Sequence, residues 1–180
     1  MTARSRLDPA RCALVIVDVQ ERFAPAIGGW DAIVERAAVL ARTATLLDIP
    51  VVVTEQYPKG LGPTVAPVRE ALDGAEPLEK GDFPATAAEG FDLAGRDQVV
   101  LCGVETHVCV LQSALSLLEA AVEVQIAVDA TGTRNPVDRE SALGRMELLG
   151  VVPTTAETFG FELLGSAGHG AFREFQEMIK

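Results

Sequence analysis

Three residues that could do chemistry each follow an apolar segment of this chain: Asp18, Lys80 and Cys109. Cys109 lies beyond an apolar run that ends at Cys102, and the segment 103–109 between them predicts a glycine turn followed by the first turn of a helix. The positive end of a helix dipole favours the thiolate form of a cysteine. A thiol at the carboxyl end of a strand in an open parallel sheet is therefore placed for nucleophilic chemistry.

Asp18 and Lys80 are the groups that could assist such a thiol. Asp18 interrupts the apolar run 13–19, where a carboxylate is costly unless it is paired or catalytic. Lys80 follows a short apolar stretch and could be its partner. Together with Cys109 they supply an acid/base, a cation and a nucleophile, the minimum for acyl transfer through a thioester.

Strand and helix patterns alternate along the chain, which predicts a doubly wound α/β layer fold in a single domain spanning residues 1–180. Two connections are long and could form the walls of a site, 55–63 and 81–95. The predicted strands are 13–19, 49–54, 76–79, 98–102, 122–128 and 151–152. The predicted helices are 31–47, 64–72, 106–120, 136–149 and 167–180.

Composition limits the partners of the chain. The formal net charge is −11 and no lysines or arginines are clustered, which argues against nucleic acid and against an anionic membrane surface. No apolar run approaches the roughly 20 residues that span a bilayer, and residues 1–11 contain no apolar signal core. Three cysteines are too few for a disulfide framework. We therefore expect a cytoplasmic protein that binds a small molecule.

Four segments together resemble one known family. They are Val-Ile-Val-Asp-Val-Gln-Glu-Arg-Phe at 15–23, Glu-Lys-Gly-Asp-Phe at 79–83, Cys-Gly-Val-Glu-Thr-His-Val-Cys-Val at 102–110 and Val-Asp-Ala-Thr-Gly-Thr-Arg at 128–134. The chain resembles the isochorismatase-like superfamily, in particular its cysteine hydrolases, from about Cys12 to Thr158. The resemblance implies a Rossmann-like, three-layer fold with six parallel strands in the order 3-2-1-4-5-6 and helices on both faces.

The same resemblance implies roles for individual residues. Asp18 would take the thiol proton and later protonate a leaving amine, Lys80 would hold the thiolate and the carboxylate electrostatically, and Cys109 would attack an amide-like carbonyl. It also implies a cis peptide between Val104 and Glu105. The backbone N–H groups of Glu105 and Cys109 would then form an oxyanion hole.

The chain departs from two branches of this superfamily. The nicotinamidase branch binds a metal through an Asp and two His near the second strand, but segment 54–62 has no histidine, and the chain has only His107 and His169. We therefore expect no metal and no cofactor. True isochorismatases lack the nucleophilic cysteine and cleave a vinyl ether, so Cys109 argues against that reaction as well.

Other candidate residues have two interpretations each. Phe23 and Phe83 could line a substrate pocket or pack in the core. Glu55, Gln56 and Tyr57 could select the substrate or build an interface.

The remaining histidines and cysteines favour structural roles. If His107 is helical it points about 200° away from Cys109, which disfavours a Cys–His dyad. His169 lies in a glycine-rich segment, as a loop residue or a contact to a partner subunit's site. Cys12 and Cys102 are expected to fill the core.

The sequence thus predicts a metal-independent cysteine hydrolase that cleaves the C–N bond of a small amide or carbamoyl-like compound. One alternative is a catalytically silent small-molecule-binding or scaffolding protein with the same fold. A second is a thiol redox sensor that uses Cys102 and Cys109. Members of the family usually assemble, so we also expect a homo-oligomer.

Overall fold

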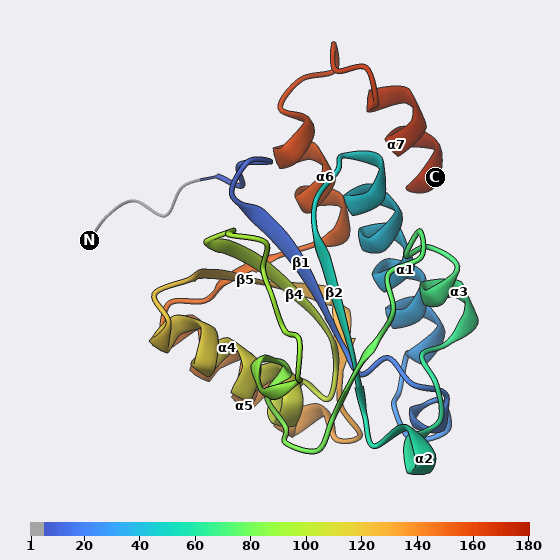
Figure 1. The fold of residues 1–180 in the computed structure, drawn as a ribbon, viewed down its shortest axis with the longest axis vertical. Coiled ribbons are helices and arrows are strands. Elements are labelled where there is room, and N and C mark those ends of the chain that lie inside the picture. Colours follow the sequence, from blue (N-terminus) through green and yellow to red (C-terminus); the bar gives the residue numbers. More distant parts are fainter. Residues whose placement is uncertain (1–5) are drawn as a thin grey trace.

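The computed structural model describes residues 6–180, so the first five residues of the N-terminal segment lie outside the described part of the chain (Figure 1). Six parallel strands form one sheet in the order β3-β2-β1-β4-β5-β6, which confirms the predicted order. The strands are β1 (Cys12–Val17), β2 (Val51–Gln56), β3 (Leu78–Lys80), β4 (Gln98–Val104), β5 (Glu123–Gly132) and β6 (Val152–Thr154).

Helices cover both faces of this sheet (Figure 1). α1, α3, α6 and α7 lie on one face, and α4 and α5 lie on the other. The α-helices are α1 (Trp30–Leu46), α2 (Pro58–Leu61), α3 (Ala66–Arg69), α4 (Leu111–Glu119), α5 (Pro136–Leu148), α6 (Ala156–Leu164) and α7 (Phe172–Met178). Shorter turns are the 3-10 turns η1 (Glu21–Phe23) and η2 (Ala85–Ala87) and the π-helical turn η3 (Thr106–Val110).

β1 is fully buried because it lies at the centre of the sheet with helices on both sides. Alternate side chains of a strand point to opposite faces. Leu14 and Ile16 therefore join the core under α1, and Val15 and Val17 join the core under α4 and α5. This two-sided burial explains the continuous apolar run in the sequence.

β1 and β4 approach each other unusually closely at their carboxyl ends. Gly103 has a φ of 111°, and a Cβ atom there would lie 2.0 Å from the Val17 carbonyl oxygen. The pairing of β4 with β5 also shifts register between Leu101 and Gly103. A glycine is therefore required where the chain leaves β4 for the segment that carries Cys109.

α6 was not predicted from the sequence. The side chain of Thr155 accepts a hydrogen bond from the Thr158 N–H at its start, and Gly165 ends it with a φ of 65°. The predicted helix 167–180 shortens to α7, and the predicted helix 64–72 shortens to α3. Among residues 6–180, no helix combines the length and the apolar character needed to cross a membrane.

Candidate active site

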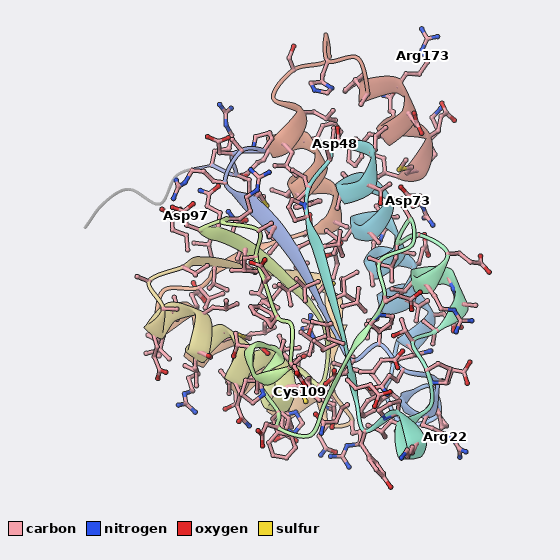
Figure 2. The ribbon with its side chains drawn as sticks, viewed as in Figure 1. Arg22, Asp48, Asp73, Asp97, Cys109 and Arg173 are labelled. Atoms are coloured by element: carbon pink, nitrogen blue, oxygen red, sulfur yellow. The ribbon has the colours of Figure 1, made fainter. Side chains whose placement is uncertain are left out.

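The carboxyl ends of β1, β3 and β4 bring the three predicted residues to one edge of the sheet. Asp18 directly follows β1, Lys80 is the last residue of β3, and Cys109 lies in η3 after β4. β1 and β4 are neighbours in the sheet although they are far apart in sequence. Open α/β sheets bind ligands at such a switch point. Cys109 marks this edge in Figure 2.

Asp18 and Lys80 form a buried ion pair. Lys80 Nζ lies 2.7 Å from Asp18 Oδ2, and neither side chain is exposed to solvent. Lys80 Nζ also donates to Gln56 Oε1 at 2.6 Å and to the Phe83 carbonyl at 3.0 Å. With a longer contact to the Asp82 carbonyl at 3.4 Å, the buried ammonium has four acceptors, which offset the cost of burying the charge.

The other carboxylate oxygen of Asp18 is also held. Thr54 Oγ1, from the neighbouring strand β2, donates to Asp18 Oδ1 at 2.7 Å. The backbone of Asp18 has a φ of 52°, in the left-handed region that few residues other than glycine adopt. Its N–H donates to the Thr54 carbonyl at 3.1 Å, which fixes this conformation. The carboxylate is therefore fixed in place by both side-chain and main-chain contacts.

Cys109 lies beside this ion pair and is itself buried, with 6% of its surface exposed. Burial, and then the negative charge of Asp18, raises the pKa of the Cys109 thiol to about 12, while the charge of Lys80 opposes the rise. Burial and the charge of Asp18 therefore oppose the thiolate form that the helix dipole was expected to favour.

The turn that carries Cys109 is anchored by Ser113, a residue that the sequence analysis did not select. Ser113 Oγ donates to the Cys109 carbonyl at 2.6 Å and accepts the Ala85 N–H at 2.7 Å. Ser113 thereby links the nucleophile's turn to the connection after β3. A serine in the middle of an apolar helix was the only sequence signal for this contact.

The cis peptide that the resemblance implies is present between Val104 and Glu105. Glu105 is the residue that precedes η3, so its N–H and that of Cys109 belong to the same short segment.

Two of the four predicted substrate contacts are accessible. Tyr57 is 63% exposed and Phe83 is 50% exposed, and both belong to connections that adjoin Lys80. Phe23 is half-buried and packs against the core under α1, as its core interpretation predicts.

Glu55, a candidate for substrate selection or for an interface, makes a contact within the chain. Its Oε1 atom accepts the Thr64 N–H at 2.6 Å and the Thr64 hydroxyl at 2.7 Å. Gln56 was another candidate for substrate selection or for an interface. Its side-chain oxygen accepts the hydrogen bond from Lys80 Nζ. Gln20 in turn holds the backbone of Gln56, because its Oε1 accepts the Gln56 N–H at 2.8 Å. These contacts join segments distant in sequence, and no local pattern indicated them.

The histidines lie where structural roles were predicted. His107 Nε2 is 3.9 Å from Asp138 Oδ2 of α5, so its ring contacts that helix. His169 Nδ1 accepts the Ala171 N–H in an exposed turn. In the described residues 6–180, no three His, Cys, Asp or Glu side chains group in a way that could hold a metal ion.

The cysteines favour no disulfide switch. Cys102 packs in the core under α1, whereas Cys109 packs in the core under α4 and α5, on the other face of the sheet. Cys12 and Cys102 are completely buried, as predicted for core residues.

Comparison with known proteins decides the family. Residues 12–158 match the family model of the isochorismatase domain. The chain belongs to the isochorismatase domain family. The matched range includes all three residues of the Asp18–Lys80–Cys109 site, and it coincides with the range over which the sequence resembled this superfamily.

Relatives of this isochorismatase domain cover almost the whole chain. Isochorismatase domain-containing protein 2A of Mus musculus is 41% identical over 97% of this chain and 85% of its own length. The structure of MAR1 ribonuclease from Caenorhabditis elegans is 38% identical, with a TM-score of 0.90 over 97% of this chain and 92% of its own. The structure of YcaC from Pseudomonas aeruginosa with hexane-2,5-diol and covalent acrylamide is 27% identical, with a TM-score of 0.85 over 99% and 98% of the two chains.

Proposed function

We propose that this isochorismatase domain is a metal-independent cysteine hydrolase that cleaves the C–N bond of a small amide or carbamoyl-like substrate. The observation that carries the proposal is a buried ion pair of a carboxylate and an ammonium whose charges both act on a buried thiol. A buried ion pair beside a thiol is costly as a purely structural feature. The membership of the chain in a hydrolase family supports the same assignment.

In the first half of the reaction, Asp18 accepts the proton of Cys109 while the sulfur attacks the substrate carbonyl carbon. A C–S bond forms and the carbonyl oxygen becomes an oxyanion. When the tetrahedral intermediate collapses, the C–N bond breaks and Asp18 returns the proton to the leaving nitrogen. Ammonia or an amine departs and a thioester remains on Cys109.

In the second half, water attacks the thioester and Asp18 accepts a proton from it. The C–S bond then breaks, the carboxylic acid product leaves, and the sulfur regains the proton. The Lys80 ammonium donates hydrogen bonds to Asp18, Gln56 and the Phe83 carbonyl. Its role is to keep the carboxylate in place and to stabilise negative charge on sulfur.

The oxyanion would be stabilised by the backbone N–H groups of Glu105 and Cys109. One such donor is typically worth about 2.7–4 kcal/mol of barrier. These donors belong to the segment that carries the nucleophile, so they move with it.

The substrate would enter past Tyr57 and Phe83, the two exposed aromatic residues that adjoin Lys80. Aromatic side chains there suit a small, partly apolar amide. Phe23 is a weaker candidate for the pocket wall because it packs into the core.

RNA is not the substrate that we propose, although one related structure is described as a ribonuclease. Nucleic acid binding needs clustered cations. This chain has 15 lysines and arginines against 26 acidic residues.

The decisive experiment screens small amides and carbamoyl compounds for release of ammonia or amine. We expect turnover by the wild-type protein and a loss of more than about 1000-fold in Cys109→Ala. Cys12→Ala is the matched control and should keep full activity, because Cys12 is buried at the opposite end of β1. A thioester on Cys109 should be trapped by rapid acid quench and mass spectrometry.

Full turnover in Cys109→Ala would refute the mechanism. Saturable ligand binding without any turnover would instead favour a catalytically silent binding protein of the same fold.

We also propose that the protein is a homo-oligomer in a reducing, cytoplasmic setting. Val137 is 70% exposed and Leu148 is 90% exposed, and both lie on α5. Exposed apolar side chains on one helix suit a contact with a second copy. A reducing setting keeps the Cys109 thiol available for attack.

A further inference from the structure

Glu105 joins the end of β4 to the turn that carries Cys109, and its carbonyl oxygen organises that turn. The Val108 N–H donates to this oxygen at 3.0 Å and the Val110 N–H donates to it at 3.3 Å. These two residues flank Cys109 on either side. The position of Glu105 therefore sets the position of the nucleophile.

The side chain of Glu105 is tied to a single residue on another strand's connection. Only 7% of this side chain is exposed. Its carboxylate accepts the Arg134 N–H at 2.9 Å and Arg134 Nε at 3.0 and 3.1 Å. Within residues 6–180, these are the hydrogen bonds that the Glu105 carboxylate accepts. A buried carboxylate that depends on one guanidinium is expensive to leave unpaired.

Arg134 itself follows β5. The end of β5 also makes hydrogen bonds to the segment that leads from β4 to the Cys109 turn. Thr131 Oγ1 lies 2.8 Å from Thr106 Oγ1 and donates to the Gly103 carbonyl at 2.8 Å. The segment from Gly103 to Thr106 is thus fixed from the β5 side while its far end carries Cys109. Arg134 is 60% exposed, so it has no role in filling the core.

We propose that Arg134 is a positioning residue for the hydrolase reaction. Its guanidinium holds Glu105, so that the Glu105 N–H and the Cys109 turn keep the arrangement that the attack requires. This inference rests on the proposed function, because it assigns Arg134 to the same site. A purely structural ion pair would affect stability and leave the chemical step unchanged.

The test measures kcat and KM on the best amide for Arg134→Met, Arg134→Lys and Glu105→Gln. We expect kcat to fall at least tenfold in Arg134→Met, with KM within about twofold of wild type. Arg134→Lys should recover only part of the loss, because an ammonium cannot reproduce the fixed fork of a guanidinium. Arg145→Met, an exposed arginine on α5, is the matched control and should be unchanged.

A double-mutant cycle tests whether Arg134 acts through Glu105. The variant with both Glu105→Gln and Arg134→Met should be no slower than the slower single variant. If the loss in kcat of the double variant equals the product of the two single losses, the two residues act independently. That result would overturn the inference. An unchanged kcat in Arg134→Met would also overturn it, leaving a structural ion pair only.

Hydrogen exchange separates a failure of this inference from a failure of the proposed function. If the wild-type protein hydrolyses no amide, the proposed function fails. Exchange at the Val108 and Val110 N–H groups still tests whether Arg134 holds Glu105 and the Cys109 turn in place. Both groups donate to Glu105, so their exchange should be at least tenfold faster in Arg134→Met and unchanged in Arg145→Met. Unaltered exchange in Arg134→Met would overturn the positioning role of Arg134, whether or not the protein hydrolyses amides.

Discussion

The Cys109 thiol lies beside a carboxylate that opposes its ionisation and an ammonium that favours it. The pKa of the thiol is raised to about 12, with burial as the main cause and the charge of Asp18 as the next. A resting thiol with an adjacent carboxylate suits a mechanism in which the proton leaves during attack. It also keeps the nucleophile protonated until substrate enters.

This arrangement predicts opposite effects of Asp18→Asn on two reactions. Removing the negative charge should lower the pKa of Cys109, because Lys80 then acts on the thiol alone. Alkylation of Cys109 by iodoacetamide at pH 7 should therefore become several-fold faster, while amide hydrolysis should be lost with the acid/base. The rates at Cys109 are measured by mass spectrometry, with Thr158→Ala as a distant control. Slower alkylation in Asp18→Asn would contradict this electrostatic account.

At the scale of elements, the close approach of β1 and β4 is the feature on which the site depends. The two strands end side by side only because Gly103 has no side chain. A methyl group there would collide with the backbone of β1, which cannot move without disturbing Asp18.

Two glycine substitutions should therefore have opposite effects on stability. Gly103→Ala should destabilise the fold by about 3 kcal/mol or more, because the added Cβ collides with backbone at a positive φ. Gly144→Ala should stabilise by about 0.5–1 kcal/mol, because Gly144 lies inside α5 and a Cβ there meets nothing within 4 Å. Urea unfolding measures both. A tolerated Gly103→Ala would show that β1 and β4 can separate without loss of the fold.

At the scale of the whole molecule, the buried thiols make the free energy of unfolding depend on pH in the alkaline range. Burial raises the pKa of Cys12 to about 12, and it raises the pKa of Cys102 as well. An unfolded thiol ionises near pH 8.5. The stability that these thiols contribute is therefore complete below about pH 8.5 and is lost as pH rises toward their folded pKa values.

We expect the free energy of unfolding to fall above about pH 9 by about 1.4 kcal/mol per pH unit for each buried cysteine. Cys12→Ala removes one of these thiols. The difference in the free energy of unfolding between wild type and variant should therefore narrow steadily from pH 9 to 11. Urea titrations at stepped pH measure it. A difference that stays constant over this range would contradict the raised pKa of Cys12.

The exposed apolar residues of α5 predict an assembly. Light scattering of the wild-type protein should give a multiple of the 19.0 kDa chain. Leu148→Glu should give a smaller species, whereas Glu140→Gln on the same helix should not. A wild-type monomer would refute the oligomer, and an unchanged mass in Leu148→Glu would place the interface elsewhere.

Much of the fold and part of the site followed from local sequence. Buried parallel strands require continuous apolar runs, so β1 and β4 were evident, and so were Asp18 and Cys109 at their ends. α6 was missed although Thr155 and Gly165 carry capping signals, because its short apolar stretch does not distinguish a helix from a strand.

Sequence by itself therefore determined the alternation of strands and helices, the family and the residue types gathered at one sheet edge. Only the tertiary structure decided that Glu55 holds a loop, that Gln56 holds Lys80, and that Arg134 holds Glu105. It also decided the direction in which the pKa of Cys109 moves. Those outcomes depend on distances between atoms from different strands, and such distances are set by how the sheet packs rather than by any local pattern of residues.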